Sequence, residues 1–179
     1  MRVVVIGGTG HVGTYLIPRL VALAHEVICV SRQQHQPYSD DPAWAKVQHC
    51  IVDRDEAERQ GEFGKMIAAL EPEVVIDLIC FTLDSVQQLV SAIEGKVQHF
   101  LHCGTIWVHG HGCEIPITES APRNPMGDYG INKARIEAYL LERVRETGFP
   151  ATIVHPGHIV GPGWVPLNPQ GNFSLEVFV

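Results

Sequence analysis

The sequence predicts an α/β fold built on a doubly wound parallel sheet. A run of β-branched residues, Val3 to Ile6, indicates a buried parallel strand. It leads directly into Gly7-x-x-Gly10-x-x-Gly13, and apolar residues at helical spacing follow as far as Leu23. Further along, strand-like apolar segments alternate with amphipathic helical ones, a pattern that implies parallel pairing with right-handed crossovers.

Six apolar segments rich in β-branched residues predict the strands. They are residues 3–6, 26–30, 47–52, 74–79, 97–101 and 151–155. Helices are predicted from Val12 onward, over about 62–70, from Asp84 as N-cap to Ile93, and over 129–146 with Gly148 as C-cap. Six strands that open on a glycine motif predict a Rossmann-type sheet with the order 3-2-1-4-5-6.

Composition excludes several classes of protein. A chain of 179 residues that is 45% hydrophobic has enough material for one α/β domain. Its net charge of −7 disfavours a nucleic-acid partner. We find no membrane-length apolar stretch and no signal peptide, and we expect a cytoplasmic protein with reduced cysteines. One group of histidines and cysteines has a spacing that matches no zinc pattern, so no metal site is predicted. It comprises His102, Cys103, His109, His111 and Cys113.

The glycine segment predicts a dinucleotide site. The first glycine permits a tight turn, the second lets backbone amides approach a pyrophosphate, and the third lets helix and strand pack closely. The candidate cofactor-binding residues in this segment are Gly7, Thr9, Gly10, His11, Val12 and Gly13. At the end of the second predicted strand, Ser31 and Arg32 stand where an acidic residue would favour NAD. A guanidinium suits a 2′-phosphate, so NADP is favoured over NAD, although Arg32 could instead stack on adenine with either cofactor.

Tyr129 and Lys133 lie four residues apart near the start of a predicted helix. This spacing puts both side chains on one face. An ammonium group and a cationic nicotinamide would both lower the pKa of a tyrosine, which could then accept a hydroxyl proton while hydride leaves the same carbon. The alternative is a surface Tyr–Lys pair without a role.

With these motifs the chain resembles the extended short-chain dehydrogenase/reductases, also called NAD-dependent epimerase/dehydratases. The resemblance rests on the glycine segment, on Tyr129 with Lys133, and on residues 155–162, His-Pro-Gly-His-Ile-Val-Gly-Pro. It implies a catalytic hydroxyl four residues before the family's aromatic residue, here replaced by His109, which selects Thr105. By resemblance, Thr105 would bind the substrate oxygen, Tyr129 would be the acid/base, and Lys133 would also hold the nicotinamide ribose.

The resemblance implies further expectations. Asp53 would contact adenine, although a solvated turn residue is an equally simple interpretation. The substrate would be a nucleotide sugar. Loss of water from it is disfavoured, because Ile106 and Trp107 follow Thr105 where dehydratases have an acid pair. His109 and His111 lie in the expected substrate loop, where either could assist the reaction, although loop histidines are usually solvated.

The domain organisation and partners follow from the same resemblance. Residues 1–163 would form the NAD(P)-binding domain and residues 164–179 the start of a truncated substrate-binding region, the rest of that lobe being missing. The helices at about 84–94 and 129–146 would form a homodimer. An alternative function on the same fold is a non-catalytic dinucleotide-sensing or RNA-associated regulator, which the Tyr–Lys pair and the net charge disfavour.

Overall fold

A computed structural model describes residues 1–32, 36–111 and 115–162 of the chain. It has the predicted parallel sheet, with the order β3-β2-β1-β4-β5-β6. The strands are β1 (Arg2–Ile6), β2 (Glu26–Ser31), β3 (Gln48–Ile51), β4 (Val74–Asp77), β5 (His99–Cys103) and β6 (Ala151–Val154). The predicted fold class and strand order are therefore confirmed.

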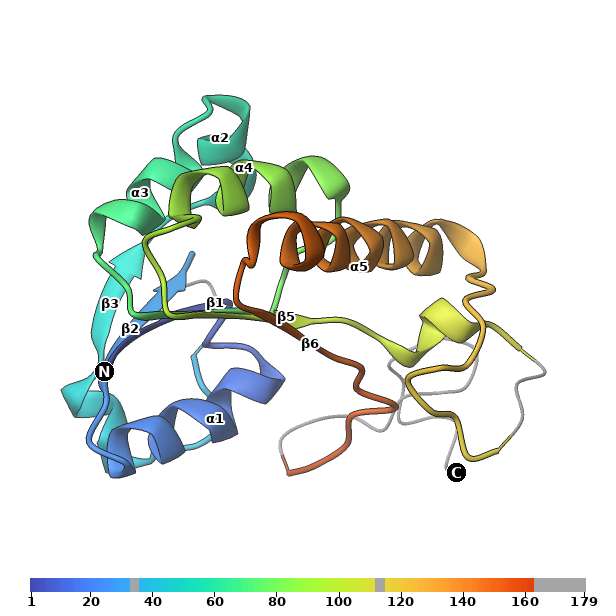
Figure 1. The fold of residues 1–179 in the computed structure, drawn as a ribbon. Coiled ribbons are helices and arrows are strands. Elements are labelled where there is room, and N and C mark those ends of the chain that lie inside the picture. The colour runs from blue at the N-terminus through green and yellow to red at the C-terminus, as the bar shows by residue number, and fades with distance from the viewer. Residues whose placement is uncertain (33–35, 112–114, 163–179) are drawn as a thin grey trace.

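Helices cover both faces of the sheet (Figure 1). On one face lies α1 (His11–Ala22), which contacts the short 3₁₀ helix η1 (Pro42–Lys46). The other face carries α2 (Arg54–Arg59), α3 (Phe63–Ala69), α4 (Leu83–Ile93) and α5 (Gly127–Thr147). A second 3₁₀ helix, η2 (Ile106–His109), follows β5. No helix among the described residues is long and apolar enough to cross a membrane.

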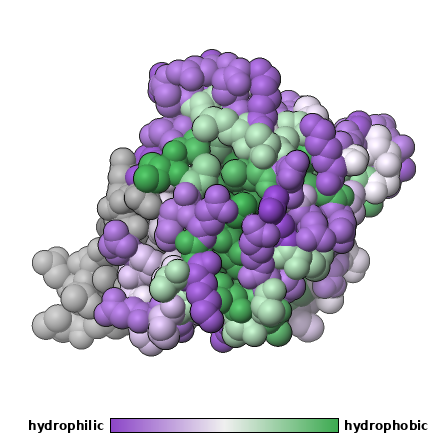
Figure 2. Space-filling model, turned by 90° about the vertical axis from the view of Figure 1, so that its left-hand side faces the viewer, coloured by the Kyte–Doolittle hydropathy of each residue, from purple (hydrophilic) through white to green (hydrophobic). Residues whose placement is uncertain are grey.

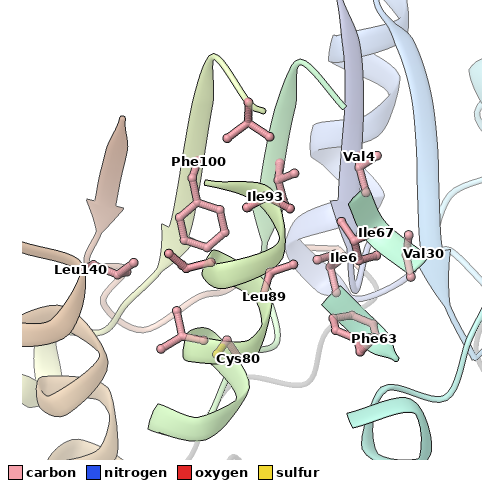
Figure 3. Packing of buried hydrophobic residues seen from close by; sticks show 14 of the residues in the cluster. Val4, Ile6, Val30, Phe63, Ile67, Cys80, Leu89, Ile93, Phe100 and Leu140 are labelled. Carbon is pink, nitrogen blue, oxygen red and sulfur yellow. The ribbon is translucent and has the colours of Figure 1, made fainter. Parts of the chain in front are cut away.

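The larger hydrophobic core lies between the sheet and helices α3, α4 and α5 (Figure 3). Strand residues such as Val4 and Phe100 meet helix residues such as Phe63, Leu89 and Leu140, and all five are buried. A smaller cluster packs under α1 around Ile17. Figure 2 views the molecule from the edge of the sheet that β3 forms, and there a band of hydrophobic residues lies at the surface between polar ones.

Several predicted boundaries are wrong in detail. Helix α2 was not predicted, because it has only six residues and its start depends on a cap, the Asp53 carboxylate accepting a hydrogen bond from the Glu56 N–H. Helix α4 is capped by Thr82 instead of Asp84, since the Thr82 hydroxyl accepts from the Ser85 amide at 3.3 Å. Gly148 ends α5 in the left-handed conformation as predicted, with φ of 71°.

The fifth strand lies two residues later than predicted. Its ladder with β4 begins where His99 pairs with Val74, so Val97 precedes the strand. As a result His102 lies inside β5, opposite Asp77. The predicted boundary between residues 163 and 164 lies outside the described residues.

Candidate active site

The turn between β1 and α1 has the geometry of an anion cradle. Gly7 has φ of +82°, and its carbonyl accepts a hydrogen bond from the Gly10 amide at 3.1 Å. Helix α1 begins at His11 with no side-chain cap, which leaves backbone N–H groups at its positive end. A Cβ at Gly13 would lie 2.5 Å from the Gly8 Cα and closer still to its carbonyl, so only glycine permits this approach of helix and turn. These features fit the pyrophosphate of a dinucleotide.

A crevice of about 280 Å³ runs from this turn across the carboxyl ends of β1, β2 and β3. It brings together six of the predicted cofactor residues, namely Gly7, Thr9, Gly10, Ser31, Arg32 and Asp53. Ser31 is buried, whereas Arg32 and Asp53 are exposed. Asp53 also serves as the cap of α2, which agrees with the interpretation of a turn residue.

The other residues of the glycine segment lie elsewhere. Val12 lines a neighbouring cleft, and His11 and Gly13 line neither space. The buried His11 ring packs against Tyr15 and Tyr38, with ring centroids 5.9 and 5.6 Å apart. Its imidazole therefore supports the start of α1 and the segment that follows β2.

A second cleft, of about 420 Å³, holds all three predicted catalytic side chains. Thr105 comes from the end of β5, where its hydroxyl accepts a hydrogen bond from the Trp107 amide at 3.3 Å. Tyr129 and Lys133 come from the first turns of α5. Thr105 and Lys133 are buried, while Tyr129 is half exposed. The chain segments that carry these groups converge although they lie far apart in the sequence.

Lys133 is held at the boundary between the cleft and the core. Its ammonium group donates a hydrogen bond to the Cys103 carbonyl at 2.7 Å. It also lies over two aromatic rings, 5.1 Å from the centre of Phe81 and 5.9 Å from that of Tyr129. Burial lowers the pKa of Lys133, and these contacts hold its amine at a cleft that Phe81 also lines.

The pKa of Tyr129 differs from the prediction. Burial raises it above its usual value, and the hydrogen bond with Thr105 offsets part of that rise. Lys133 does not lower it, because its ammonium is directed to the backbone of β5. In this arrangement the phenol is a proton donor at neutral pH, and the expected effect of a cationic nicotinamide stays a prediction.

A buried ion pair lies beside the dinucleotide crevice. Arg54 donates to both carboxylate oxygens of Asp77, at 2.9 and 3.0 Å, and to Glu58 at 2.6 Å. Its guanidinium lies 4.8 Å from the centre of the Phe63 ring. Because Arg54 also lines the dinucleotide crevice, this pair connects the crevice to the end of β4.

Three further residues that line these spaces were not predicted as site residues. Phe81 lines both the crevice and the cleft, and Trp107 and His158 form part of the cleft wall. Phe81 follows β4, Trp107 lies in η2 after β5, and His158 follows β6 within the segment 155–162 that carries the family resemblance. A residue just beyond the carboxyl end of a parallel strand is a general signal for such positions.

Of the two loop histidines, only His109 differs from the expectation of a solvated residue. His109 is buried, its Nδ1 lies 3.2 Å from the Pro122 carbonyl oxygen, and its ring packs on His155. It is therefore a structural residue and does not line the cleft. His111 is exposed, with its ring 6.0 Å from that of Trp107, and Cys113 lies outside the described residues. Within the described part of the chain, no group of three or more His, Cys, Asp or Glu side chains could hold a metal ion.

Comparison with known proteins identifies the family. The sequence model of the NAD dependent epimerase/dehydratase family matches residues 3–176. The chain belongs to this family. Among curated relatives, a 2′-dehydrokanamycin reductase of Streptomyces kanamyceticus is 29% identical over 137 residues, covering 76% of this chain and 37% of the relative. A UDP-glucose 4-epimerase of Vibrio cholerae is 25% identical over 173 residues, covering 90% and 52%.

Solved structures of family members share the fold. A UDP-glucose 4-epimerase of Thermotoga maritima with UDP-glucose matches 99% of this chain and 61% of its own, with a TM-score of 0.77 and 20% identity. A UDP-N-acetylglucosamine 4-epimerase of Methanobrevibacter ruminantium has a TM-score of 0.78 at 18% identity, covering 96% and 59%. The chain thus spans from about a third to about three fifths of the length of these relatives.

Proposed function

We propose that this chain carries the cofactor site and the catalytic groups of an NAD(P)-dependent oxidoreductase or epimerase. It would act on a hydroxyl or carbonyl carbon of a nucleotide sugar. The observation that carries the proposal is that Thr105, Tyr129 and Lys133 line one cleft, and that this cleft shares Phe81 with the crevice at the glycine turn. Relatives named as nucleotide-sugar epimerases and as a reductase support the same chemistry.

Each residue then has a role that follows from its position. A bound nicotinamide cofactor would supply or accept the hydride. The Thr105 hydroxyl, buried and fixed by η2, would hydrogen-bond the reacting oxygen of the substrate. Tyr129 would donate its proton to that oxygen during reduction and take it back during oxidation. Lys133, anchored on Cys103 and beside Phe81, would bind the ribose next to the nicotinamide.

For the cofactor we propose NADP, with Arg32 binding the 2′-phosphate. Arg32 is exposed at the edge of the crevice, and Ser31 beside it offers a hydroxyl. The test is calorimetric titration with NADPH and NADH of the wild type and of Arg32→Ala. We expect the variant to bind NADPH about tenfold more weakly and NADH almost unchanged. A tenfold preference of the wild type for NADH would refute the NADP assignment and leave the rest of the proposal intact.

The catalytic proposal is tested with Tyr129→Phe. We expect this variant to bind the cofactor as the wild type does and to lose nearly all turnover of UDP-glucose to UDP-galactose, because the substitution removes only the phenolic hydroxyl group that exchanges the proton. Tyr139→Phe is a matched control that removes a hydroxyl group from the same helix outside the cleft, and it should leave turnover unchanged. Full activity of Tyr129→Phe would rule out the proposed acid/base.

A homodimer through α4 and α5 is also proposed. Ile136 and Leu140 face the core, but Leu141 and Val144 on α5 are 43% and 36% exposed. Their exposure leaves apolar area on this helix for a second copy to cover. Light scattering of the purified chain and of Leu141→Glu tests this proposal, and a wild-type monomer at high concentration would refute it.

A further inference from the structure

We propose that Trp107 and His158 form the part of the active cleft that recognises the substrate, and that they recognise an uncharged sugar ring. The inference rests on the proposed function, because both residues line the cleft that contains Thr105 and Tyr129. Within that function, these two residues would select the substrate through its sugar ring.

Trp107 is fixed relative to the catalytic groups. Its amide donates to the Thr105 hydroxyl at 3.3 Å. Its carbonyl packs closely on the first turns of α5, where a Cβ added at Gly130 would lie 3.1 Å from the Trp107 oxygen. Gly130 follows Tyr129 directly, so the backbone of Trp107 is held between the two residues that would contact the reacting oxygen.

The His158 ring lies near the same indole in the cleft. The segment after β6 is tied to η2 by a hydrogen bond from the Ile106 amide to the Pro156 carbonyl at 3.2 Å. Two residues later, the His158 ring lies 6.4 Å from the Trp107 ring in a T-shaped arrangement at 65°. The indole is partly buried and the imidazole is exposed, so both are accessible to a ligand in the cleft.

The charges around the cleft favour an uncharged ligand. Among the described residues that line it, Lys133 is the only Lys, Arg, Asp or Glu side chain, and its ammonium is already bonded to Cys103. A phosphate would find no guanidinium there, and a cationic amine would find no carboxylate. The available groups are the rings of Phe81, Trp107 and Tyr129, one imidazole and two hydroxyls, which suit an apolar surface edged with a few polar atoms.

A pyranose ring has this combination of surfaces. Its C–H face can stack on the indole of Trp107, and its hydroxyl groups can exchange hydrogen bonds with His158. Stacking would place the ring beside Thr105, where one of its carbons could be oxidised or reduced. For a nucleotide sugar, the nucleotide would then extend away from this wall and contribute nothing to the contact with Trp107.

The test is ¹⁹F NMR of the chain labelled with 5-fluorotryptophan and saturated with NADP⁺. The Trp107 signal is assigned from Trp107→Phe, and Trp44, in η1, provides an internal reference. The probes are methyl β-D-glucopyranoside, UDP-glucose and UDP alone. We expect the glucoside and UDP-glucose to shift the Trp107 signal and leave that of Trp44 in place, while UDP alone leaves both unchanged.

Variants measure the strength of the contact. Trp107→Leu keeps apolar volume but removes the ring face, and we expect UDP-glucose to bind roughly tenfold to a hundredfold more weakly. His158→Leu should weaken UDP-glucose binding about fivefold. His158→Gln should keep most of the wild-type affinity, because the amide can replace the imidazole hydrogen bond. Trp44→Phe is the control, with unchanged sugar affinity. All these variants should keep the wild-type affinity for NADP⁺.

Two results would overturn the inference. One is a Trp107 signal that no sugar probe shifts in the cofactor-saturated wild type. The other is unchanged UDP-glucose affinity in Trp107→Leu. Failure of the wild type to bind either NADP⁺ or NAD⁺ would instead refute the proposed function, so the two failures are distinguishable.

Discussion

His102 offers a sharp prediction because it is a buried histidine whose ring has no hydrogen-bond partner among the described residues. Its side chain is 0% exposed, and both ring nitrogens lack a partner there. Such unpaired polar atoms cost folding free energy. Replacing the imidazole with an apolar side chain of similar size, His102→Leu, should therefore stabilise the protein by about 1–2 kcal/mol at pH 7.5.

A second, independent prediction is how much the free energy of unfolding changes with pH because of His102. Burial, with a smaller contribution from the charge of Lys133, lowers the pKa of His102 from 6.5 to about 4. As the pH falls, His102 is therefore protonated near pH 6.5 in the unfolded chain but only near pH 4 in the folded chain. Stability from this group is fully present above pH 6.5 and is lost as the pH falls toward 4. At pH 4.5 the loss amounts to about 2.5 kcal/mol.

The assay is urea unfolding followed by circular dichroism at pH 7.5 and pH 4.5. Between these values the wild type should lose about 2.5 kcal/mol more than His102→Leu. The control is His49→Gln, which removes an exposed histidine of β3 and separates the loss of any histidine from the loss of the buried one. The reasoning fails if His102→Leu is less stable than the wild type at pH 7.5, or if the two lose stability in parallel.

Two further predictions concern the turn and the ion pair. Gly13→Ala forces a Cβ into the Gly8 backbone, so it should cost at least about 3 kcal/mol of stability and abolish dinucleotide binding, whereas Gly157→Ala, where the nearest atom is 3.7 Å away, should be nearly neutral. Thermal melts and NADPH titration check both, and normal binding by Gly13→Ala would contradict the close approach. Asp77→Leu leaves the Arg54 guanidinium buried without its main partner and should cost about 3–5 kcal/mol, while the double variant with Arg54→Met should recover most of that loss. Additive losses in urea unfolding would show that the pair is not coupled.

The fold was largely predictable because local and global signals agree. The apolar strands, the glycine motif and the β/α alternation each favour the same parallel sheet, and the strand order follows from them. The errors lie where a single side chain decides a boundary. Thr82 and Asp84 are both good caps, and only the hydrogen bond to Ser85 in the folded chain selects Thr82.

The candidate site was predictable only in part. Spacing along one helix was enough to place Tyr129 beside Lys133, and the glycine motif was enough to place the turn. The convergence of Phe81, Trp107 and His158 depends on how the loops after three strands approach one another, and a sequence pattern contains no such distance. The expected effect of Lys133 on the pKa of Tyr129 was wrong, because spacing along the helix does not show that the Lys133 ammonium is bonded to the Cys103 carbonyl.

The central claim is that a dinucleotide lies across the β1–α1 turn with its nicotinamide beside Tyr129 and Lys133. A crystal structure of the chain with NADP⁺ tests it most directly. The account predicts the pyrophosphate at the amides of the glycine segment and the nicotinamide in the cleft with Thr105. A dinucleotide bound at any other place, or side chains of Tyr129 and Lys133 directed away from the nicotinamide, would contradict it.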